Sequence, residues 1–460
     1  MGSLTTALLS SAGALRVFQQ GFNVIENNVT NANTPGYSAQ RQNLEAAPFE
    51  QGTGLLGGLR AGPVTSADSP FLDRAVRNQL QQFGSAQQQA SDLPRVQPLF
   101  DTSGQALLPG TLSAFFNSFS QLSVNPNDQP SRQNAITAAQ NVAKEFNANA
   151  AGIQRAQTNV YSETLSTVDR INHLAAQIAN VNREYQATPN RAEDGGLQAQ
   201  LNSALDELSQ YVNYTTIANP DGSYNVLIGG QTTLVTGAQS STISANSTSS
   251  GTFITDAQGN DITAQLQNTG SNNGGGALGA ELQTSNVILP GYLNSLNDIA
   301  QTFADTVNTT LSQGVDSSGA PPPVNLFQYN PLTGAAATLS VTNITPAQIA
   351  AASAGAPGGN GNALAVANIA NQSIVGGSTV TQAYGNLAGQ VGQDVSNAKQ
   401  EQNTQQNLVD QVQQQRKSAT GVSLDAEAAQ LLQLQQAYQA VGQLVTTLNH
   451  LTQTVIDMVR

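Results

Sequence analysis

The sequence predicts an α+β multidomain protein, with a long helical-bundle stem made from both chain termini and a β-rich domain inserted in the middle. Apolar residues recur every three or four positions near both ends of the 460-residue chain and again over about 131–186, which is the period of amphipathic helices. Between about 211 and 235 the period changes to two, and turns containing glycine and proline interrupt it, which is typical of strands.

The first helix is expected to carry an apolar face that only Ser11 interrupts. Its members are Leu4, Leu8, Leu15, Phe18, Phe22, Ile25 and Val29. The helix is expected to end in the asparagine-rich run that follows Asn27. Asparagine competes with the helix backbone for hydrogen bonds, and the residue before Pro35 avoids the helical region.

The last helix carries a matching apolar face. Its members are Leu431, Leu434, Tyr438, Val441, Val445, Leu448, Val455 and Val459. We call the two faces together the terminal seam. Most of a helix's stability comes from packing its apolar face, so each face needs a partner in this chain or in a neighbouring copy. Pairing of the two ends is the favoured arrangement, and burial of both helices in one globular core is the alternative.

Sequence motifs beside these helices carry a family resemblance. The run 27–37, with Asn28, Asn31, Asn33, Thr34, Pro35, Gly36 and Tyr37, resembles the signature of bacterial flagellar rod, hook and hook-associated proteins. Residues 421–427 and 434–440 resemble the C-terminal signature of the same group. The segment 111–128 is similar to the hook-associated protein 1 family in particular, because rod and hook proteins have no equivalent of it.

The resemblance and the periodicity together predict three domains. Residues 1–35 plus 421–460 would form a terminal, coiled-coil-like inner-tube domain. Residues 36–190 plus 380–420 would form a helical bundle with a β-hairpin, and 191–379 a β-rich outer domain.

The elements between the ends follow from local patterns. Glycines and prolines in 38–70 favour a β-hairpin, and Phe115, Phe116 and Phe119 are expected to pack in a core. The helix over 131–186 is the longest expected element, with 385–417 as its candidate partner. Further helices are expected at 71–92, 194–210 and 282–311, and strands at 211–218, 223–228 and 231–235.

Composition argues against several classes of protein. A net charge of −13 disfavours nucleic acid and anionic membrane surfaces as partners. The chain has no cysteine, so it has neither disulfides nor thiolate metal sites. No membrane-spanning helix or cleaved signal peptide is expected. The resemblance implies export through the flagellum's own type III exporter.

No catalytic, cofactor or metal site is expected, and the protein is predicted not to be an enzyme. The chain has two histidines, His173 and His450, which lie far apart in sequence. Residues 52–57 match GxGxxG formally but lack a βαβ context, and 256–261 lack EF-hand spacing.

The resemblance implies a secreted, extracellular structural subunit at the hook–filament junction of the bacterial flagellum, which serves motility. It would self-assemble into a ring or helical turn. Its partners would be further copies of the chain, the hook protein, the second junction protein and an export chaperone. The alternatives are another axial subunit of the rod or hook, or an outer domain that acts as a hydrolase or an adhesin.

Overall fold

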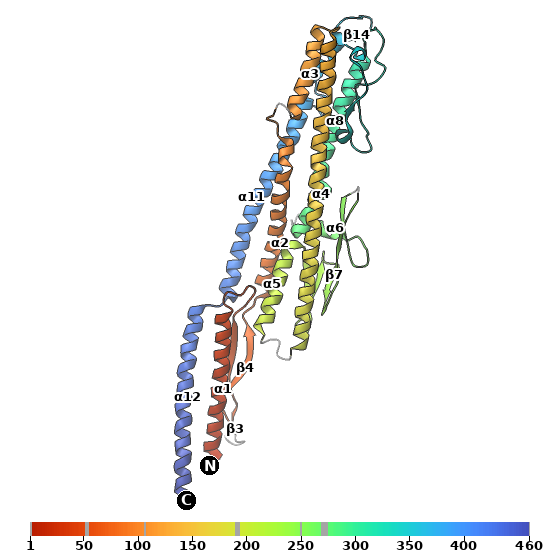
Figure 1. Ribbon diagram of the computed structural model, residues 1–460. Coiled ribbons are helices and arrows are strands. Elements are labelled where there is room, and N and C mark those ends of the chain that lie inside the picture. Colours follow the sequence, from red (N-terminus) through yellow and green to blue (C-terminus); the bar gives the residue numbers. More distant parts are fainter. Residues whose placement is uncertain are drawn as a thin grey trace.

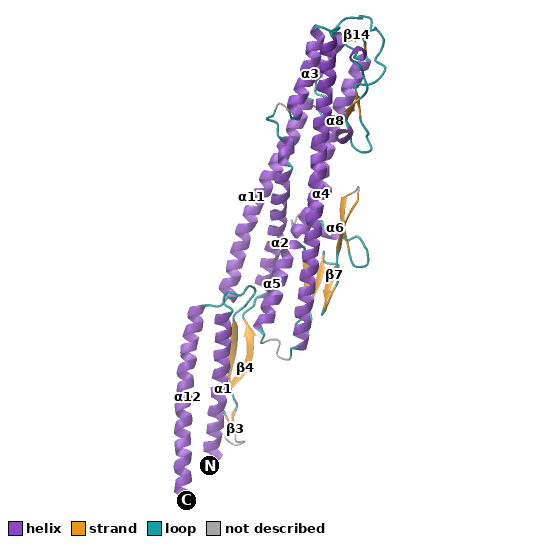
Figure 2. Ribbon diagram, viewed as in Figure 1, coloured by secondary structure: helices purple, strands orange, loops and turns teal. Residues whose placement is uncertain are grey.

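The protein is described by a computed structural model that covers residues 2–50, 55–104, 107–188, 194–248, 251–267 and 275–459. The molecule is elongated, and its first and last helices lie side by side at the lower end of Figure 1. Helices dominate, and the strands lie beside them rather than between them (Figure 2). This confirms the predicted class, a helical stem built from both ends of the chain with a β-containing middle.

The helices, in chain order, are α1 (Gly2–Thr30), α2 (Pro70–Asp92), η1 (Leu93–Arg95), η2 (Gln97–Phe100), α3 (Leu108–Val124), α4 (Gln129–Ala187), α5 (Gly195–Tyr211), α6 (Thr263–Leu266), α7 (Gly276–Gln283), the π-helical turn η4 (Thr284–Ile288), α8 (Leu289–Ser312), α9 (Ala335–Thr338), η5 (Pro346–Gln348), α10 (Gly361–Asn368), η6 (Ile369–Asn371), α11 (Val380–Thr420) and α12 (Leu424–Val459).

The strands form small antiparallel sheets. They are β1 (Gln40–Ala46), β2 (Phe49–Glu50), β3 (Leu55–Leu56), β4 (Leu59–Ser66), β5 (Tyr214–Ala218), β6 (Tyr224–Ile228), β7 (Thr232–Thr236), β8 (Gln239–Ser240), β9 (Ser244–Thr248), β10 (Gly251–Thr255), β11 (Gly314–Val315), β12 (Phe327–Gln328), β13 (Ser340–Val341) and β14 (Ala352–Ser353). The largest sheet has the order β5-β6-β7-β8, and β1 pairs with β4 in the expected hairpin. Residues 51–54 of the glycine-rich run lie outside the described residues.

An upper core holds one end of the stem together. Phe115 and Phe119 of α3 are fully buried there with Phe303 of α8 and Phe327 of β12. The ring centroids of Phe115 and Phe303 lie 5.3 Å apart, and those of Phe303 and Phe327 lie 5.2 Å apart, which suits edge-to-face and tilted packing. The predicted core role of Phe115, Phe116 and Phe119 is therefore confirmed.

A lower core lies between the second half of α4, helices α5 and α7, and the larger sheet. Ile171 and Leu174 of α4 are buried against Leu208 of α5 and Leu234 of β7. Asn182 attaches the sheet to α4, because its amide donates to the carbonyl oxygens of Tyr224 (2.8 Å) and Gly237 (2.7 Å).

The longest helix extends a little beyond its predicted bounds. Asp128 begins α4, since its carboxylate accepts a hydrogen bond from the Ser131 N–H at 2.9 Å. The prediction that the 385–417 segment pairs with this helix is wrong. The 385–417 segment, within α11, packs chiefly on α2, where Val409 is buried with Val76 and Leu80. Helix α4 packs on α3, α5 and α8 instead.

The middle segment 191–379, which was expected to be β-rich, also contains several helices. Its longer strands lie between Tyr214 and Thr255, whereas α8 and α10 belong to the upper core. The reason is that Phe303 and Val307 of α8 bury their side chains in the same cluster as Phe115. The three-domain division itself stays a prediction.

Helix α2 approaches α5 closely at Gly84, which generates a testable prediction. A Cβ at Gly84 would lie 2.0 Å from the carbonyl oxygen of Gln210. Gly84→Ala should therefore lower the free energy of unfolding by about 1–3 kcal/mol, measured by chemical denaturation. Gly389→Ala on α11 is the control. A Cβ there meets nothing within 4 Å, so it should stabilise by about 0.5–1 kcal/mol. Equal effects of the two changes would contradict this packing.

Candidate assembly site

The terminal seam pairs α1 with α12 over a narrow apolar strip (Figure 1). Phe18 and Ile25 of α1 are buried there with Leu434 of α12. The rings of Phe22 and Tyr438 pack with centroids 6.0 Å apart. The strand residue Leu59 covers one side of this cluster, so the hairpin supports the helix pair.

The residues of the predicted seam that pack in this contact are Phe18, Phe22, Ile25, Leu431, Leu434, Tyr438 and Val441. Most of the seam is only partly buried. The half-buried members are Leu4, Leu8, Leu15, Phe22, Leu431, Tyr438, Val441, Val445, Leu448 and Val455. Val29 is 47% exposed and lines the groove between the two helices, and its place in the assembly interface stays a prediction. The neighbouring residue Asn28 contacts Glu427 of α12 at the upper end of the helix pair. The side chain of Val459 lies outside the described residues.

Further apolar side chains on these two helices face outward. Leu9 of α1 and Leu432, Leu444, Leu451 and Met458 of α12 are all exposed, Met458 by 74%. Leu444, Leu451 and Met458 recur every seven residues, so they share one flank of the helix. An open groove of about 670 Å³ also lies between the helices, lined by Phe22, Val29, Leu431 and Tyr438 among others. The helix pair therefore leaves much apolar surface uncovered.

Asn28 joins four parts of the chain at the top of the helix pair. Its buried amide Nδ2 donates to the carbonyl oxygen of Gln40 (2.8 Å) and to Oε1 of Glu427 (2.9 Å). Its Oδ1 accepts from the Tyr37 hydroxyl (3.0 Å) and from the Gln40 N–H (2.8 Å). These bonds connect α1 with the turn after it, with β1 and with α12. We call them the Asn28 network.

Burial raises the pKa values of Tyr37 and Glu427, the two titratable members of the Asn28 network. Burial, with a smaller effect from the charge of Glu427, raises the pKa of Tyr37 to about 12, so the hydroxyl stays a donor at neutral pH. Burial also raises the pKa of Glu427, although the bond from Asn28 and the charge of Arg41 oppose the shift. Oε2 of Glu427 is buried with no hydrogen-bond partner in the described residues.

The motif residues after Asn28 build the turn that leads into the hairpin. Asn31 donates to the Asn27 carbonyl oxygen (3.0 Å) and accepts from the Thr34 hydroxyl (3.1 Å), while Asn33 and Pro35 are exposed. Gly36 has a φ of 76°, and a Cβ there would lie 2.5 Å from the Ala199 carbonyl oxygen of α5. Both facts require glycine at this position.

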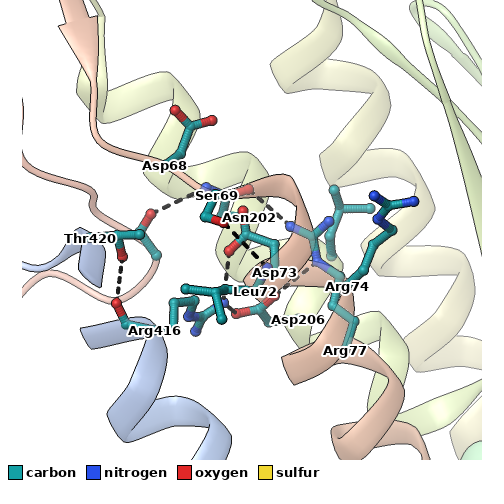
Figure 3. Close-up of polar contacts among 12 residues, drawn as sticks. Asp68, Ser69, Leu72, Asp73, Arg74, Arg77, Asn202, Asp206, Arg416 and Thr420 are labelled. Atoms are coloured by element: carbon teal, nitrogen blue, oxygen red, sulfur yellow. Dashed lines mark hydrogen bonds and ion pairs between the residues drawn. The ribbon is translucent and has the colours of Figure 1, made fainter. Parts of the chain in front are cut away.

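An ion cluster near the motif turn holds three helices of the stem together (Figure 3). Asp206 of α5 accepts from Arg77 of α2 at 3.0 Å and pairs with Arg416 of α11 at 2.7 Å. Arg416 also reaches Asp73 of α2 at 3.4 Å, and Arg77 donates to Asn202 at 2.9 Å. These side chains are largely shielded from solvent, which strengthens their attraction compared with a surface pair. A cleft of about 680 Å³ lies between this cluster and the motif turn.

Sequence reasoning missed several of these residues. Glu427 lies four residues before Leu431 and seven before Leu434, so the helical period places it on the apolar face. A charged residue on such a face could have indicated a buried polar contact. Arg77, Asp206 and Arg416 lie far apart in the chain, and no local pattern connects them.

The described part of the chain offers little for other kinds of chemistry. No group of three or more acidic, histidine or cysteine side chains in it is arranged to hold a metal ion. None of the helices among the described residues combines the length and apolarity needed to cross a membrane.

Comparisons with a family model, with related sequences and with a solved structure agree with one another. The family model "Flagellar hook-associated protein FlgK helical domain" matches residues 93–327. The chain is 27% identical to flagellar hook-associated protein 1 of Bacillus subtilis (strain 168), over 99% of each chain. It is 25% identical to the protein of that name from Salmonella typhimurium, over 100% of each. The flagellar hook junction protein FlgK from Burkholderia pseudomallei shares the fold, with a TM-score of 0.65 at 16% identity over 76% of this chain and 100% of that one.

The Asn28 network predicts that one substitution loosens both terminal helices. Asn28→Ala leaves buried partners unpaired and should cost about 2 kcal/mol, so proteolytic cleavage within α1 and α12 should become roughly thirtyfold faster. Asn27→Ala, at the exposed neighbouring residue, is the matched control and should leave the cleavage rate unchanged. Equal cleavage rates in the two variants would contradict the role given to Asn28.

Proposed function

This chain belongs to the family of the flagellar hook-associated protein FlgK, and from that premise we propose that it is a structural subunit joining the flagellar hook to the filament. The observation that carries the proposal is the terminal seam. Its two helices pair with each other but leave Leu432, Leu444 and Leu451 exposed. Several large apolar side chains left exposed on one helix favour a protein contact there.

The mechanism we propose is coupled folding and assembly. In the free chain the narrow α1–α12 contact gives the two helices little stability of their own. When copies meet, their exposed apolar flanks would be buried against one another, and the helices would become fixed around a central tube. The terminal domain, 1–35 plus 421–460, would line this tube. The bundle 36–190 plus 380–420 would surround it, and 191–379 would project outward.

The partners follow from the same proposal. The chain would contact copies of itself, the hook protein on one side and the second junction protein on the other, and an export chaperone before assembly. It would be secreted and would act in the extracellular part of the flagellum. Neither nucleic acid nor membrane insertion has a place in this scheme.

The alternatives have less support. The family model covers 93–327, the region that contains the 111–128 segment by which this family differs from rod and hook subunits. A hydrolytic role for the outer domain would need a catalytic site, and residues 214–255 contain Asp221 as their one acidic residue and no histidine.

Deletion of the gene tests the proposal directly. Electron microscopy of the deleted cells should show complete hooks without filaments, and flagellin should accumulate in the medium. Missing hooks would assign the protein to the rod or hook instead. Normal filaments would overturn an axial role altogether.

A second prediction isolates the exposed flank of α12. The double variant Leu444→Gln, Leu451→Gln should fold normally, because both side chains are exposed and such changes cost within about 0.5 kcal/mol. It should nevertheless fail to restore filaments to deleted cells, as counted by microscopy. Leu332→Gln is the control, because Leu332 is 93% exposed and lies outside the terminal seam. Full restoration by the double variant would count against assembly through this flank.

A further inference from the structure

The stem contains two separate apolar cores that meet about midway along α4 (Figure 1). The upper core includes α4 residues as far as Val160, and the lower core begins at Val168. Between these two residues the buried face of α4 is polar. Thr164 is fully buried, and Thr167 is nearly so.

Acidic groups from three helices gather at this level, of which Asp92 and Glu281 are buried and Glu163 is half-buried. Asp92 ends α2, Glu163 lies on α4, and Glu281 lies on α7. We call these three residues the acidic layer. Gln88 donates to both Asp92 Oδ1 and Glu163 Oε2, each at 3.0 Å. Thr167 donates to Glu281 Oε1 at 2.7 Å, so the layer joins α2, α4 and α7.

Positive charge in the layer is scarce. Arg95 of η1 donates to Glu163 and lies 3.8 Å from Asp92. The charged groups that act on Glu281 are Asp92 and Glu163. Helix α11 packs nearby through apolar Val395 and Ala398 against Leu93, and its Lys399 is exposed. Three carboxyl groups therefore face one guanidinium.

Several oxygen atoms in and beside the layer have no partner. Asp92 Oδ2, Glu281 Oε2 and Thr284 Oγ1 are buried without a hydrogen bond in the described residues. An ionised carboxylate in this position would be costly, whereas a neutral carboxylic acid is both uncharged and a donor. Thr284 begins the π-helical turn η4, where the regular helical hydrogen bonding between α7 and α8 is interrupted.

We propose that the acidic layer is a proton-dependent joint: bound protons hold the two cores of the stem together, and their loss loosens the contact of α2 and α7 with α4. Burial, with contributions from Glu163, raises the pKa of Asp92 to about 7. Burial, opposed by the Thr167 bond, raises the pKa of Glu281 to about 8. Both values lie above those of unfolded carboxyl groups, so folding binds protons here. The stabilisation is complete below about pH 4 and is lost as the pH rises through 7 to 8.

The test is a set of thermal melts of the full chain between pH 6 and 9. The melting temperature of the wild-type stem should fall with rising pH, and Glu281→Gln and Asp92→Asn should each reduce that fall by about 2 °C or more. Glu281→Gln keeps an acceptor for the Thr167 hydroxyl. Asp169→Asn, at an exposed carboxylate on α4, should leave the profile unchanged. A wild-type profile that none of the variants alters would overturn the proposal.

Infrared spectroscopy of the unmodified chain tests the same proposal without any risk of misfolding. The carbonyl band of a protonated carboxylic acid should be present at pH 7 and absent by pH 9. Its absence at pH 7 would show that the layer is already ionised, which would also overturn the proposal. Neither experiment depends on flagellar assembly, so failure here leaves the proposed function untouched.

Discussion

The side-chain amide of Asn28 is the contact on which the arrangement of the two chain ends depends. It makes all four hydrogen bonds open to an asparagine, to Gln40, Tyr37 and Glu427. The group is buried, so a lost partner leaves a polar atom that water does not replace. The apolar contact of the terminal seam begins one turn away at Ile25. Hydrogen bonding therefore sets the register in which α1 meets α12, and apolar packing extends it along both helices.

The stem and the terminal helices are stabilised in different ways. The stem buries large apolar clusters, such as the rings around Phe115 and Phe303, within one copy of the chain. The terminal helices bury only a narrow strip and leave Leu444 and Met458 in solvent. The ion cluster of Arg77, Asp206 and Arg416 lies where the two regions meet. The stem is therefore stabilised within one copy of the chain, whereas the terminal helices keep apolar surface that the proposed assembly would bury.

The sequence predicted the elements better than their partners. The period of 3.6 located α4 and both terminal helices, and the alternation around Tyr224 located β6, because these patterns reflect which face of an element is buried. The partner of α11 could not be predicted, since its weak, glutamine-rich apolar face fits several helices equally well. Asn28 belonged to a recognised motif, but its four partners lie in separate segments and became visible only in the fold. The acidic layer was likewise hidden, because Asp92, Glu163 and Glu281 are each unremarkable in sequence.

Hydrogen exchange of the free, full-length chain, compared with the assembled state, tests the central claim most directly. The account predicts that backbone amides of 2–30 and 424–459 exchange far faster than those in the middle of α4 while the chain is free, and become protected on assembly. Terminal amides as well protected as those of α4 in the free chain would contradict it, because the α1–α12 pair would then be stable without its neighbours.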